Sequence, residues 1–270
     1  MSEKAVRNIV NLSGGKDSTA LAIYLRDRVP DLEYVFCDTD KELPETYEYL
    51  NRLEAYLGQP VVRLKARGMG FDHFLAMRRG FLPSARNRWC TEQLKLRPFE
   101  AFVGTDVVCS YIGIRADEQR IGYISHRPNI KALFPFKKEG IGREDVLRIL
   151  DRSGLGMPAY YRWRSRSGCY FCFFQQKIEW LGLLENHPDL FQKAKAYENM
   201  APKGFASFTW SDGESLDQLA EPGRIAEIRA QFAAREATER ERRHDVRLVD
   251  LFEDIVADES MERACLICDL

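Results

Sequence analysis

The chain has 270 residues, enough for one large domain or for one domain with a substantial appendage. Its 40 basic and 41 acidic residues leave a formal net charge of −1, so any contact with nucleic acid has to come from a local basic surface. No apolar run approaches the roughly 20 residues of a membrane span, and the first residues lack the apolar core of a signal peptide. We therefore expect a cytoplasmic protein that does not contact a membrane.

Apolar, β-branched segments alternate with amphipathic segments along the first part of the chain. The expected strands are residues 9–12, 34–37, 61–64 and 107–114. The expected helices are residues 18–27, 44–57 and 92–102, with a shorter one near 144–150. This alternation predicts an α/β fold with a parallel sheet and helices on both faces. Ligands bind beyond the carboxyl ends of the strands in such sheets, so motifs that follow the strands should converge.

Residues 13–18, Ser-Gly-Gly-Lys-Asp-Ser, connect the first expected strand to the first expected helix. The two glycines allow a sharp turn that brings backbone N–H groups close to an anion, and the start of the helix directs its positive dipole end at the same place. The serines add hydroxyl donors and Lys16 adds positive charge. The spacing differs from that of a Walker P-loop. The segment therefore predicts a different kind of pyrophosphate-binding turn.

Polar residues also follow the second expected strand and precede the third expected helix. Asp38 and Thr39 come directly after the strand, where a carboxylate is well placed to hold Mg²⁺ or a ribose hydroxyl. Cys90 lies near a helix start beside Arg88 and Lys95, and such surroundings favour a reactive thiolate. A buried, inert cysteine is the alternative interpretation of Cys90.

Residues 113–120, Gly-Ile-Arg-Ala-Asp-Glu-Gln-Arg, follow the last expected strand. Arg115 and Arg120 could neutralise phosphate oxygens, and Glu118 could orient these arginines or bind a metal ion. The alternative is an ion-pair network on a solvated loop. Because the loop should lie at the mouth of the site, we favour a functional role.

The later part of the chain is expected to be mostly helical. Helical patterns cover residues 174–185, 188–199, 222–242 and 246–256. We expect two domains, a nucleotide-binding domain over residues 1–165 and a helical C-terminal portion over residues 166–270.

Four of the seven cysteines form two Cys-x-x-Cys pairs. They are Cys169, Cys172, Cys265 and Cys268. Four thiolates of this kind hold a tetrahedral Zn²⁺ ion or a [4Fe–4S] cluster, and Cys90 is the alternative ligand if only one member of the last pair reaches the site. The competing interpretation is that the last pair is disordered or unligated, because chain termini often fray.

Taken together, the motifs between residues 8 and 187 resemble those of the PP-loop ATP pyrophosphatases and the phosphoadenosine phosphosulfate (PAPS) reductase family. Residues 13–18 resemble the PP-loop, and residues 36–46 resemble the Asp-Thr-Gly…Phe-Pro-Glu-Thr segment. Residues 88–95 resemble the family's Cys…Lys segment, and residues 113–120 resemble its Gly-Ile-Arg-x-x-Glu-x-x-Arg loop. Residues 134–146 resemble its Pro…Asp-Val segment, and residues 166–172 resemble its Arg-x-Gly-Cys-x-x-Cys segment. The resemblance implies a Rossmann-like, adenine nucleotide α-hydrolase-like sheet and an enzyme that uses Mg²⁺ and ATP, splitting ATP between the α and β phosphates.

The same resemblance implies roles for particular residues. The residues implied in catalysis are Lys16, Asp17, Arg115, Glu118 and Cys90. The residues implied in nucleotide binding are Ser13, Gly14, Gly15, Lys16, Asp17, Ser18, Asp38, Thr39, Gly113, Arg115 and Arg120.

Within this family, the intact loop and the Cys-x-x-Cys pairs most resemble the ATP pyrophosphatases of DNA phosphorothioation systems, in which sulfur replaces a backbone phosphate oxygen. That resemblance implies a role in phage defence, a cysteine desulfurase as sulfur donor with Cys90 as a carrier, other phosphorothioation subunits as partners, and an oligomer. A basic and aromatic surface could contact DNA or the partner protein, and the alternative interpretation of these residues is a solvated loop. The residues of this surface are Arg162, Trp163, Arg164 and Arg166.

Three other functions stay open at this point. They are a PAPS or adenylylsulfate reductase, a tRNA-thiolating enzyme, and a subunit that binds ATP as a sensor or scaffold without cleaving it. The tail over residues 263–270 departs from the reductases, because it lacks their histidine and carries a second cysteine.

Overall fold

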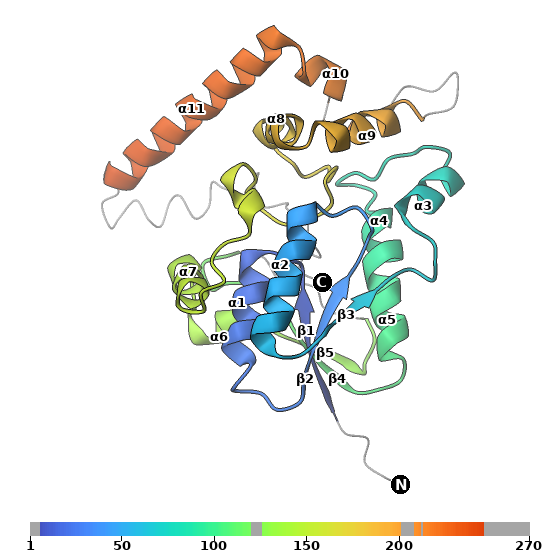
Figure 1. The fold of residues 1–270 in the computed structure, drawn as a ribbon, viewed down its shortest axis with the longest axis vertical. Coiled ribbons are helices and arrows are strands. Elements are labelled where there is room, and N and C mark those ends of the chain that lie inside the picture. Colours follow the sequence, from blue (N-terminus) through green and yellow to red (C-terminus); the bar gives the residue numbers. More distant parts are fainter. Residues whose placement is uncertain (1–5, 120–125, 201–207, 212, 246–270) are drawn as a thin grey trace. The chain divides into compact units, whose positions relative to one another are not determined.

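A five-stranded sheet forms the centre of the first part of the chain (Figure 1). The computed structural model describes residues 6–119, 126–200, 208–211 and 213–245, with residues 240–245 as backbone only. The strands are β1 (Arg7–Leu12), β2 (Leu32–Cys37), β3 (Val61–Leu64), β4 (Val108–Tyr111) and β5 (Ile130–Leu133). They lie in the order β3-β2-β1-β4-β5, and each neighbouring pair is parallel.

The strand order reverses at β1, because the chain runs outward to β2 and β3 and then returns to β4 on the other side of β1. In parallel sheets this reversal opens a crevice at the carboxyl ends of the strands, where ligands bind. Residues 13–18 follow β1 directly and therefore lie at this crevice.

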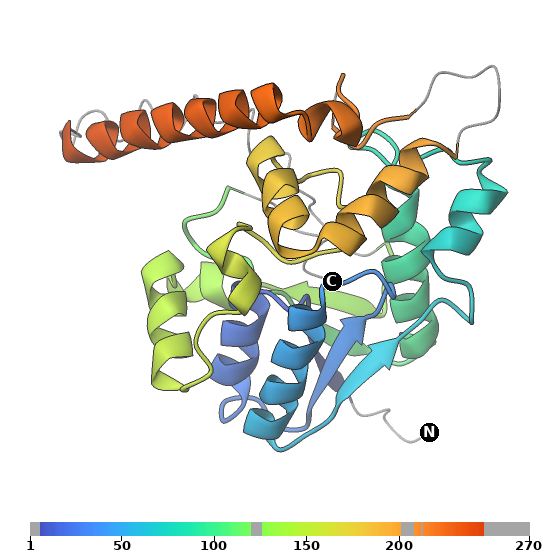
Figure 2. The same ribbon diagram turned by 45° about the horizontal axis from the view of Figure 1, so that its top comes forward.

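Helices cover both faces of the sheet (Figures 1 and 2). Successive residues of β1 belong to two different buried clusters, because side chains alternate between the faces of a strand. Val10 and Leu12 pack with α1 (Lys16–Leu25), α2 (Pro44–Leu57) and α7 (Arg143–Arg152). Ile9 packs with α5 (Arg97–Val103). The predicted α/β fold with helices on both faces is thus confirmed.

Several elements differ from the expectation. The expected third helix, residues 92–102, is divided into a π-helical turn η1 (Glu92–Leu96) and α5. Elements without a sequence prediction are α3 (Phe71–Met77), α4 (Trp89–Thr91), β5, α6 (Pro135–Glu139), the 3₁₀ turn η2 (Ala159–Arg162) and α10 (Leu216–Leu219). β5 is a short strand at the edge of the sheet with one buried residue, Ile130, so it lacks the continuous apolar run of a central strand.

The chain divides into two compact units, and the division lies close to residue 169. Among the described residues, the first unit comprises those up to 78 and 87–169, and the second comprises 79–86 and those from 170 onward. Residues 79–86 belong to the second unit although they precede α4. Within that unit the ring of Phe81 meets the ring of Phe208 edge to face, with centroids 4.4 Å apart.

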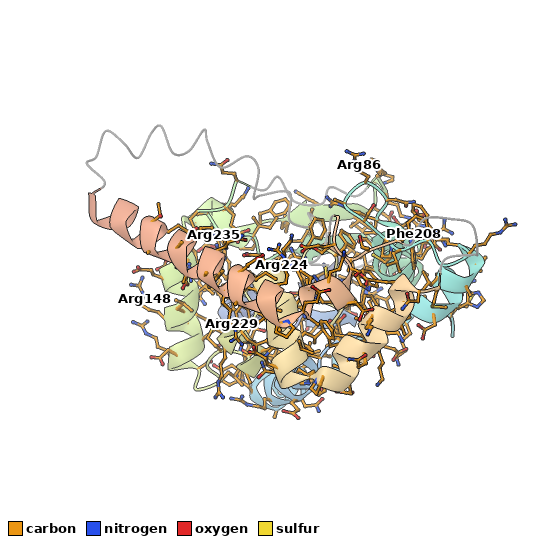
Figure 3. All side chains as sticks on the ribbon, turned by 90° about the horizontal axis from the view of Figure 1, so that it is seen from above. Arg86, Arg148, Phe208, Arg224, Arg229 and Arg235 are labelled. Carbon is orange, nitrogen blue, oxygen red and sulfur yellow. The ribbon has the colours of Figure 1, made fainter. Side chains whose placement is uncertain are left out.

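The second unit is built from helices, as expected. These are α8 (Lys177–Asn186), α9 (Pro188–Glu198), α10 (Leu216–Leu219) and α11 (Pro222–Asp245). Three arginines that follow one another along α11 bind the preceding elements of this unit (Figure 3). Arg224 pairs with Glu214, Arg229 pairs with Glu185, and Arg235 donates to Gln176 Oε1 at 2.7 Å.

The expected helix over residues 246–256 lies outside the described residues. Among the helices that the structure describes, none is long and apolar enough to cross a membrane.

Candidate functional site

The turn after β1 is shaped by its two glycines. Gly14 has φ +72°, and a Cβ atom there would lie 2.5 Å from Thr46 Cγ2. A Cβ atom on Gly15 would lie 2.7 Å from Ser167 Oγ. The Thr19 N–H donates to the Gly15 carbonyl at 3.2 Å, so the amides of the preceding residues point out of the helix end. The turn therefore has the backbone shape that the sequence predicts, and its role in anion binding stays a prediction.

The serine hydroxyls of the turn bind one another and the backbone. The Ser13 N–H donates to Ser18 Oγ at 3.1 Å, and the two serine oxygens are also 3.1 Å apart. Ser167 Oγ donates to Ser13 Oγ at 3.1 Å. All three side chains are buried. In this arrangement the serines fix the shape of the turn.

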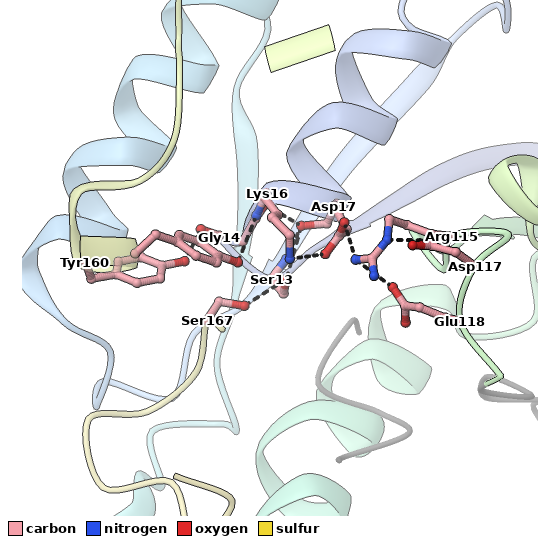
Figure 4. Close-up of polar contacts among 12 residues, drawn as sticks. Ser13, Gly14, Lys16, Asp17, Arg115, Asp117, Glu118, Tyr160 and Ser167 are labelled. Atoms are coloured by element: carbon pink, nitrogen blue, oxygen red, sulfur yellow. Dashed lines mark hydrogen bonds and ion pairs between the residues drawn. The ribbon is translucent and has the colours of Figure 1, made fainter. Parts of the chain in front are cut away.

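Four of the predicted catalytic residues lie in one cluster of charges (Figure 4). Asp17 Oδ2 accepts from Lys16 Nζ at 2.9 Å, and Asp17 Oδ1 accepts from Arg115 at 2.9 Å. The same guanidinium pairs with Glu118 Oε1 at 2.9 Å and with Asp117 Oδ1 at 2.9 Å. Burial alone would lower the pKa of Arg115, but the carboxylates of Asp17 and Glu118 outweigh burial and raise it. Arg115 therefore stays charged at the start of α1.

Arg115 reaches Asp17 because the backbone of its loop passes close to the first turn of α1. A Cβ atom on Gly113 would lie 3.0 Å from the carbonyl carbon of Asp17 and 3.0 Å from the Ser18 nitrogen. Only glycine allows the loop after β4 to lie so near the first turn of α1. Arg120, at the far end of this loop, lies outside the described residues.

Sequence analysis missed residues that contact the turn from much later in the chain. Tyr160 Oη donates to the Gly14 carbonyl at 2.8 Å, and the Lys16 N–H donates to Tyr161 Oη at 3.3 Å. These tyrosines and Ser167 are 145 to 154 positions away from their partners. No local pattern could have indicated them, because the turn and the later segment meet only in the folded chain.

Asp38 and Thr39 lie at the carboxyl end of β2, close to Cys169. Asp38 Oδ1 accepts from the Asp40 N–H at 2.9 Å and from Tyr47 Oη at 2.8 Å. Thr39 Oγ1 lies 3.2 Å from Cys169 Sγ. The bonds of Asp38 brace the strand end, and Thr39 connects it to the segment that carries Cys169.

Glu42 is a buried carboxyl group in the same cluster. Its Oε1 atom accepts from Thr39 Oγ1 at 2.9 Å and lies 3.6 Å from Cys169 Sγ. Among the described residues, its Oε2 atom has no hydrogen-bond partner. Burial raises the pKa of Glu42, although the positive charges of Lys95 and Arg164 oppose burial.

We expect Glu42→Gln to increase the free energy of unfolding at pH 8 and to have less effect at pH 4. A carboxyl group with a raised folded pKa costs stability above that pKa, and the cost disappears as the pH falls through it toward the usual value of 4.5. Urea unfolding at both pH values measures the difference. The exposed Glu48→Gln is the matched control on α2 and should be neutral at both. An equal effect of Glu42→Gln at both pH values would contradict the burial argument.

The predicted basic surface is smaller than expected. Arg164 is 2% exposed, and it donates to the carbonyls of Gly168 and Cys169 at 2.9 and 2.8 Å. Arg164 therefore braces the chain and does not belong to that surface, while Arg162 is exposed. Cys90, the remaining predicted catalytic residue, is half-buried in α4.

The predicted four-cysteine metal site is only partly described. Cys169 lies in the first unit and Cys172 in the second, and both are half-buried. Cys265 and Cys268 lie outside the described residues. Over the described ranges, no group of three or more His, Cys, Asp or Glu side chains is placed to hold a metal ion. A zinc or iron–sulfur centre thus stays a prediction.

If the four cysteines bind a metal, freshly purified protein should contain close to one zinc ion or one iron–sulfur cluster per chain. Elemental analysis and the visible absorption spectrum measure this. Cys172→Ser should remove most of the metal, because a thiolate ligand is lost. Cys109→Ser is the control, since Cys109 stands on β4 outside both pairs. Metal-free protein would show that the four-cysteine prediction is wrong.

ATP and Mg²⁺ fit the residues of the first unit. The glycine turn forms a cradle that a Cβ atom would fill, and Lys16 and Arg115 supply positive charge beside it. The Asp17 carboxylate is an oxygen ligand of the kind that Mg²⁺ takes, and Mg²⁺ sites commonly need only one or two protein carboxylates plus phosphate oxygens. The turn at the point where the strand order reverses thus has the shape and the charge to hold a phosphate group.

Comparison with known proteins finds a family match over part of the chain. Residues 7–131 match the phosphoadenosine phosphosulfate reductase domain family, which is just under half of the chain. The predicted resemblance to this family is thus confirmed over that segment. The match contains the PP-loop, Asp38, Cys90 and Arg115.

The chain is also similar to proteins of archaea and phages. An uncharacterized protein of Methanocaldococcus jannaschii is 27% identical, and the similarity covers 68% of this chain and 40% of that protein. A second uncharacterized protein of the same organism is 25% identical over 68% of this chain and 45% of its own length. This chain thus spans less than half the length of either protein. An uncharacterized 37.8 kDa protein of Escherichia phage 186 is 26% identical, with coverage of 72% of this chain and 75% of that protein.

Two solved structures share part of the chain path. The PAPS reductase of Candida auris in complex with phosphate has a TM-score of 0.48 and 14% identity, and covers 62% of this chain and 82% of the reductase. The U34-tRNA thiolase of Methanococcus maripaludis, with its [4Fe-4S] cluster, has a TM-score of 0.41 and 13% identity, with 80% of each chain covered.

Proposed function

We propose that this protein is an ATP pyrophosphatase, which cleaves ATP between the α and β phosphates and transfers the AMP group to an acceptor oxygen. The observation that carries the proposal is the junction of β1 and α1, where the helix amides, Lys16 and Arg115 meet at one point. Such a site suits a leaving pyrophosphate, which develops negative charge as it departs.

The reaction places few demands on the protein beyond position and charge. The acceptor oxygen attacks the α phosphorus, the bond from that phosphorus to the bridging oxygen breaks, and the electron pair leaves on pyrophosphate. Lys16 and Arg115 neutralise the departing oxygens, and the amides of the turn donate hydrogen bonds to them. Tyr160 and the buried serines keep the turn in the required shape. Bound Mg²⁺ would add further charge neutralisation, with Asp17 as its protein ligand.

We propose that the acceptor is the DNA backbone, into which sulfur is incorporated. Support comes from the intact PP-loop together with Cys-x-x-Cys pairs, the combination found in phosphorothioation enzymes. A cysteine desulfurase would supply the sulfur, and Cys90 in α4 is the residue proposed to carry it. Sulfur carried as a persulfide on Cys90 would attack the adenylylated phosphate and displace AMP, and a thiol reductant would then cleave the S–S bond and restore the Cys90 thiol. Reconstitution with a desulfurase, cysteine, ATP, a thiol reductant and DNA tests this step, with phosphorothioate dinucleotides after nuclease digestion as the product. Full transfer by Cys90→Ser would show that Cys90 is not the carrier.

The experiment that tests the proposed function is an ATP assay on the purified chain. ATP and MgCl₂ are incubated with the protein, with and without duplex DNA, and AMP and pyrophosphate are measured. Pyrophosphate release matched by an equal amount of AMP, either free or attached to the DNA, supports the proposal, whereas ADP and phosphate, or ATP binding without products, contradict it.

A second candidate function is the reduction of PAPS or adenylylsulfate. The match of residues 7–131 to the PAPS reductase domain family favours it. Release of sulfite from PAPS in the presence of a thiol reductant would identify a reductase, and this product is absent from the ATP reaction.

A further inference from the structure

The hydroxyl of Tyr161 lies at the start of α1, on one of the groups that an anion would use. The Lys16 N–H donates to Tyr161 Oη at 3.3 Å, and Lys16 Nζ lies 5.2 Å from the centroid of the tyrosine ring. A single tyrosine thus contacts both the amide and the ammonium group of the PP-loop lysine. A Cβ atom on Gly15 would also lie 3.2 Å from Tyr161 Oη, so the hydroxyl lies directly over the turn.

The neighbouring Tyr160 makes a contact of a different kind. Its hydroxyl donates to the Gly14 carbonyl at 2.8 Å, and its side chain is fully buried. A phosphate oxygen cannot replace that bond, because a carbonyl does not donate. The bond at Tyr161 has an N–H donor, and its length of 3.3 Å exceeds the usual range of about 2.7–3.2 Å. Tyr161 is also only half-buried. A phosphate oxygen can therefore replace the hydroxyl of Tyr161 but not that of Tyr160.

The backbone around Tyr161 is fixed at several points. Tyr160 anchors the 3₁₀ turn η2 to Gly14, and Arg164 holds the following residues through the Gly168 and Cys169 carbonyls. The ring of Tyr161 also stacks on that of Tyr160, with centroids 4.9 Å apart. Release of the Lys16 amide therefore requires the Tyr161 hydroxyl to move away while the neighbouring contacts hold the backbone.

We propose that Tyr161 gates the PP-loop, an inference that rests on the proposed function because the ligand admitted is the pyrophosphate group of ATP. Its hydroxyl holds the Lys16 amide, and a phosphate oxygen binds that amide only after Tyr161 releases it. A charged phosphate oxygen is the stronger acceptor, so the exchange proceeds toward the anion. Breaking the hydrogen bond between the Lys16 amide and Tyr161 costs free energy, and this cost lowers the affinity for the ligand.

Calorimetric titration of the full chain with inorganic pyrophosphate tests the gate. Tyr161→Phe keeps a ring over Lys16 Nζ and removes the oxygen that competes for the Lys16 amide. We expect this variant to bind pyrophosphate about three- to tenfold more tightly than the wild type, the effect of one neutral hydrogen bond. Equal or weaker binding by Tyr161→Phe overturns the gate.

Tyr160→Phe is the matched control on the adjacent residue. It removes a hydroxyl of the same kind but releases a carbonyl, so pyrophosphate should bind no more tightly than to the wild type. Tighter binding by both variants would show a general loosening of the segment and would also overturn the gate.

The titration separates this inference from the proposed function. Pyrophosphate that binds to the wild type, with no gain in Tyr161→Phe, removes the gate and leaves the ATP pyrophosphatase proposal standing. Lack of binding to all three proteins removes both. Tighter binding by Tyr161→Phe without AMP formation from ATP supports the gate and contradicts the proposed reaction.

Discussion

If the proposed function is correct, Lys16→Ala should reduce the rate of ATP cleavage by about a hundredfold or more, because it removes an ammonium group that would neutralise the leaving pyrophosphate. The turn should persist, because alanine keeps the backbone N–H and Asp17 keeps its ion pair with Arg115. The measurements are the initial rate of pyrophosphate release and the melting temperature.

Two further variants interpret the result. Lys16→Arg retains a positive charge and should recover part of the rate. Lys138→Ala changes an exposed lysine of α6 in the same unit and should leave the rate unchanged. A lower melting temperature for Lys16→Ala with an unchanged rate would show that Lys16 only neutralises Asp17.

Gly14→Ala should lower the free energy of unfolding by roughly 2–5 kcal/mol and abolish pyrophosphate release. The residue has φ +72°, which costs a non-glycine residue roughly 1–2 kcal/mol. The new methyl group would also lie 2.5 Å from Cγ2 of the fully buried Thr46, an overpacking that costs roughly 1–3 kcal/mol. Urea denaturation measures the change.

A double-mutant cycle separates the two causes. Thr46→Ser removes Cγ2, and the next nearest atom, Thr46 Cβ, is 3.8 Å away from the added carbon. The double variant should therefore be more stable than the sum of the single changes predicts, although the backbone strain stays. Costs that add to within about 0.5 kcal/mol would show that the two residues do not clash.

The sequence predicts the sheet and the turn well because both depend on local patterns. The strand at Val61–Leu64 and the helix at Pro44–Leu57 lie at the expected residues. The PP-loop has a local cause as well, since two glycines between an apolar strand and a helix suffice to form it. The short edge strand Ile130–Leu133 escaped prediction because half-buried edge strands need no continuous apolar run.

The charge cluster could be predicted only in part. Arg115 and Glu118 stood out because their loop follows a strand, and the carboxyl ends of parallel strands converge. The pairing of Arg115 with Asp17 depends on the backbone contact at Gly113, which no spacing along the chain indicates. The place of Tyr161 and Ser167 at the site depends on contacts between residues about 150 positions apart in the chain. The burial of Arg164 could not be predicted, because the composition of its segment fits a buried and an exposed arginine equally well.

The contacts of Tyr160 and Ser167 have a consequence for the order in which the turn acquires its shape during synthesis. The strand, turn and helix at residues 7–25 leave the ribosome early, but these two side chains are translated about 150 residues later. A nascent chain that ends at residue 131, where the family match ends, carries residues 13–18 without Tyr160 and Ser167. If the proposed function is correct, tight nucleotide binding should therefore begin only once translation has passed Ser167.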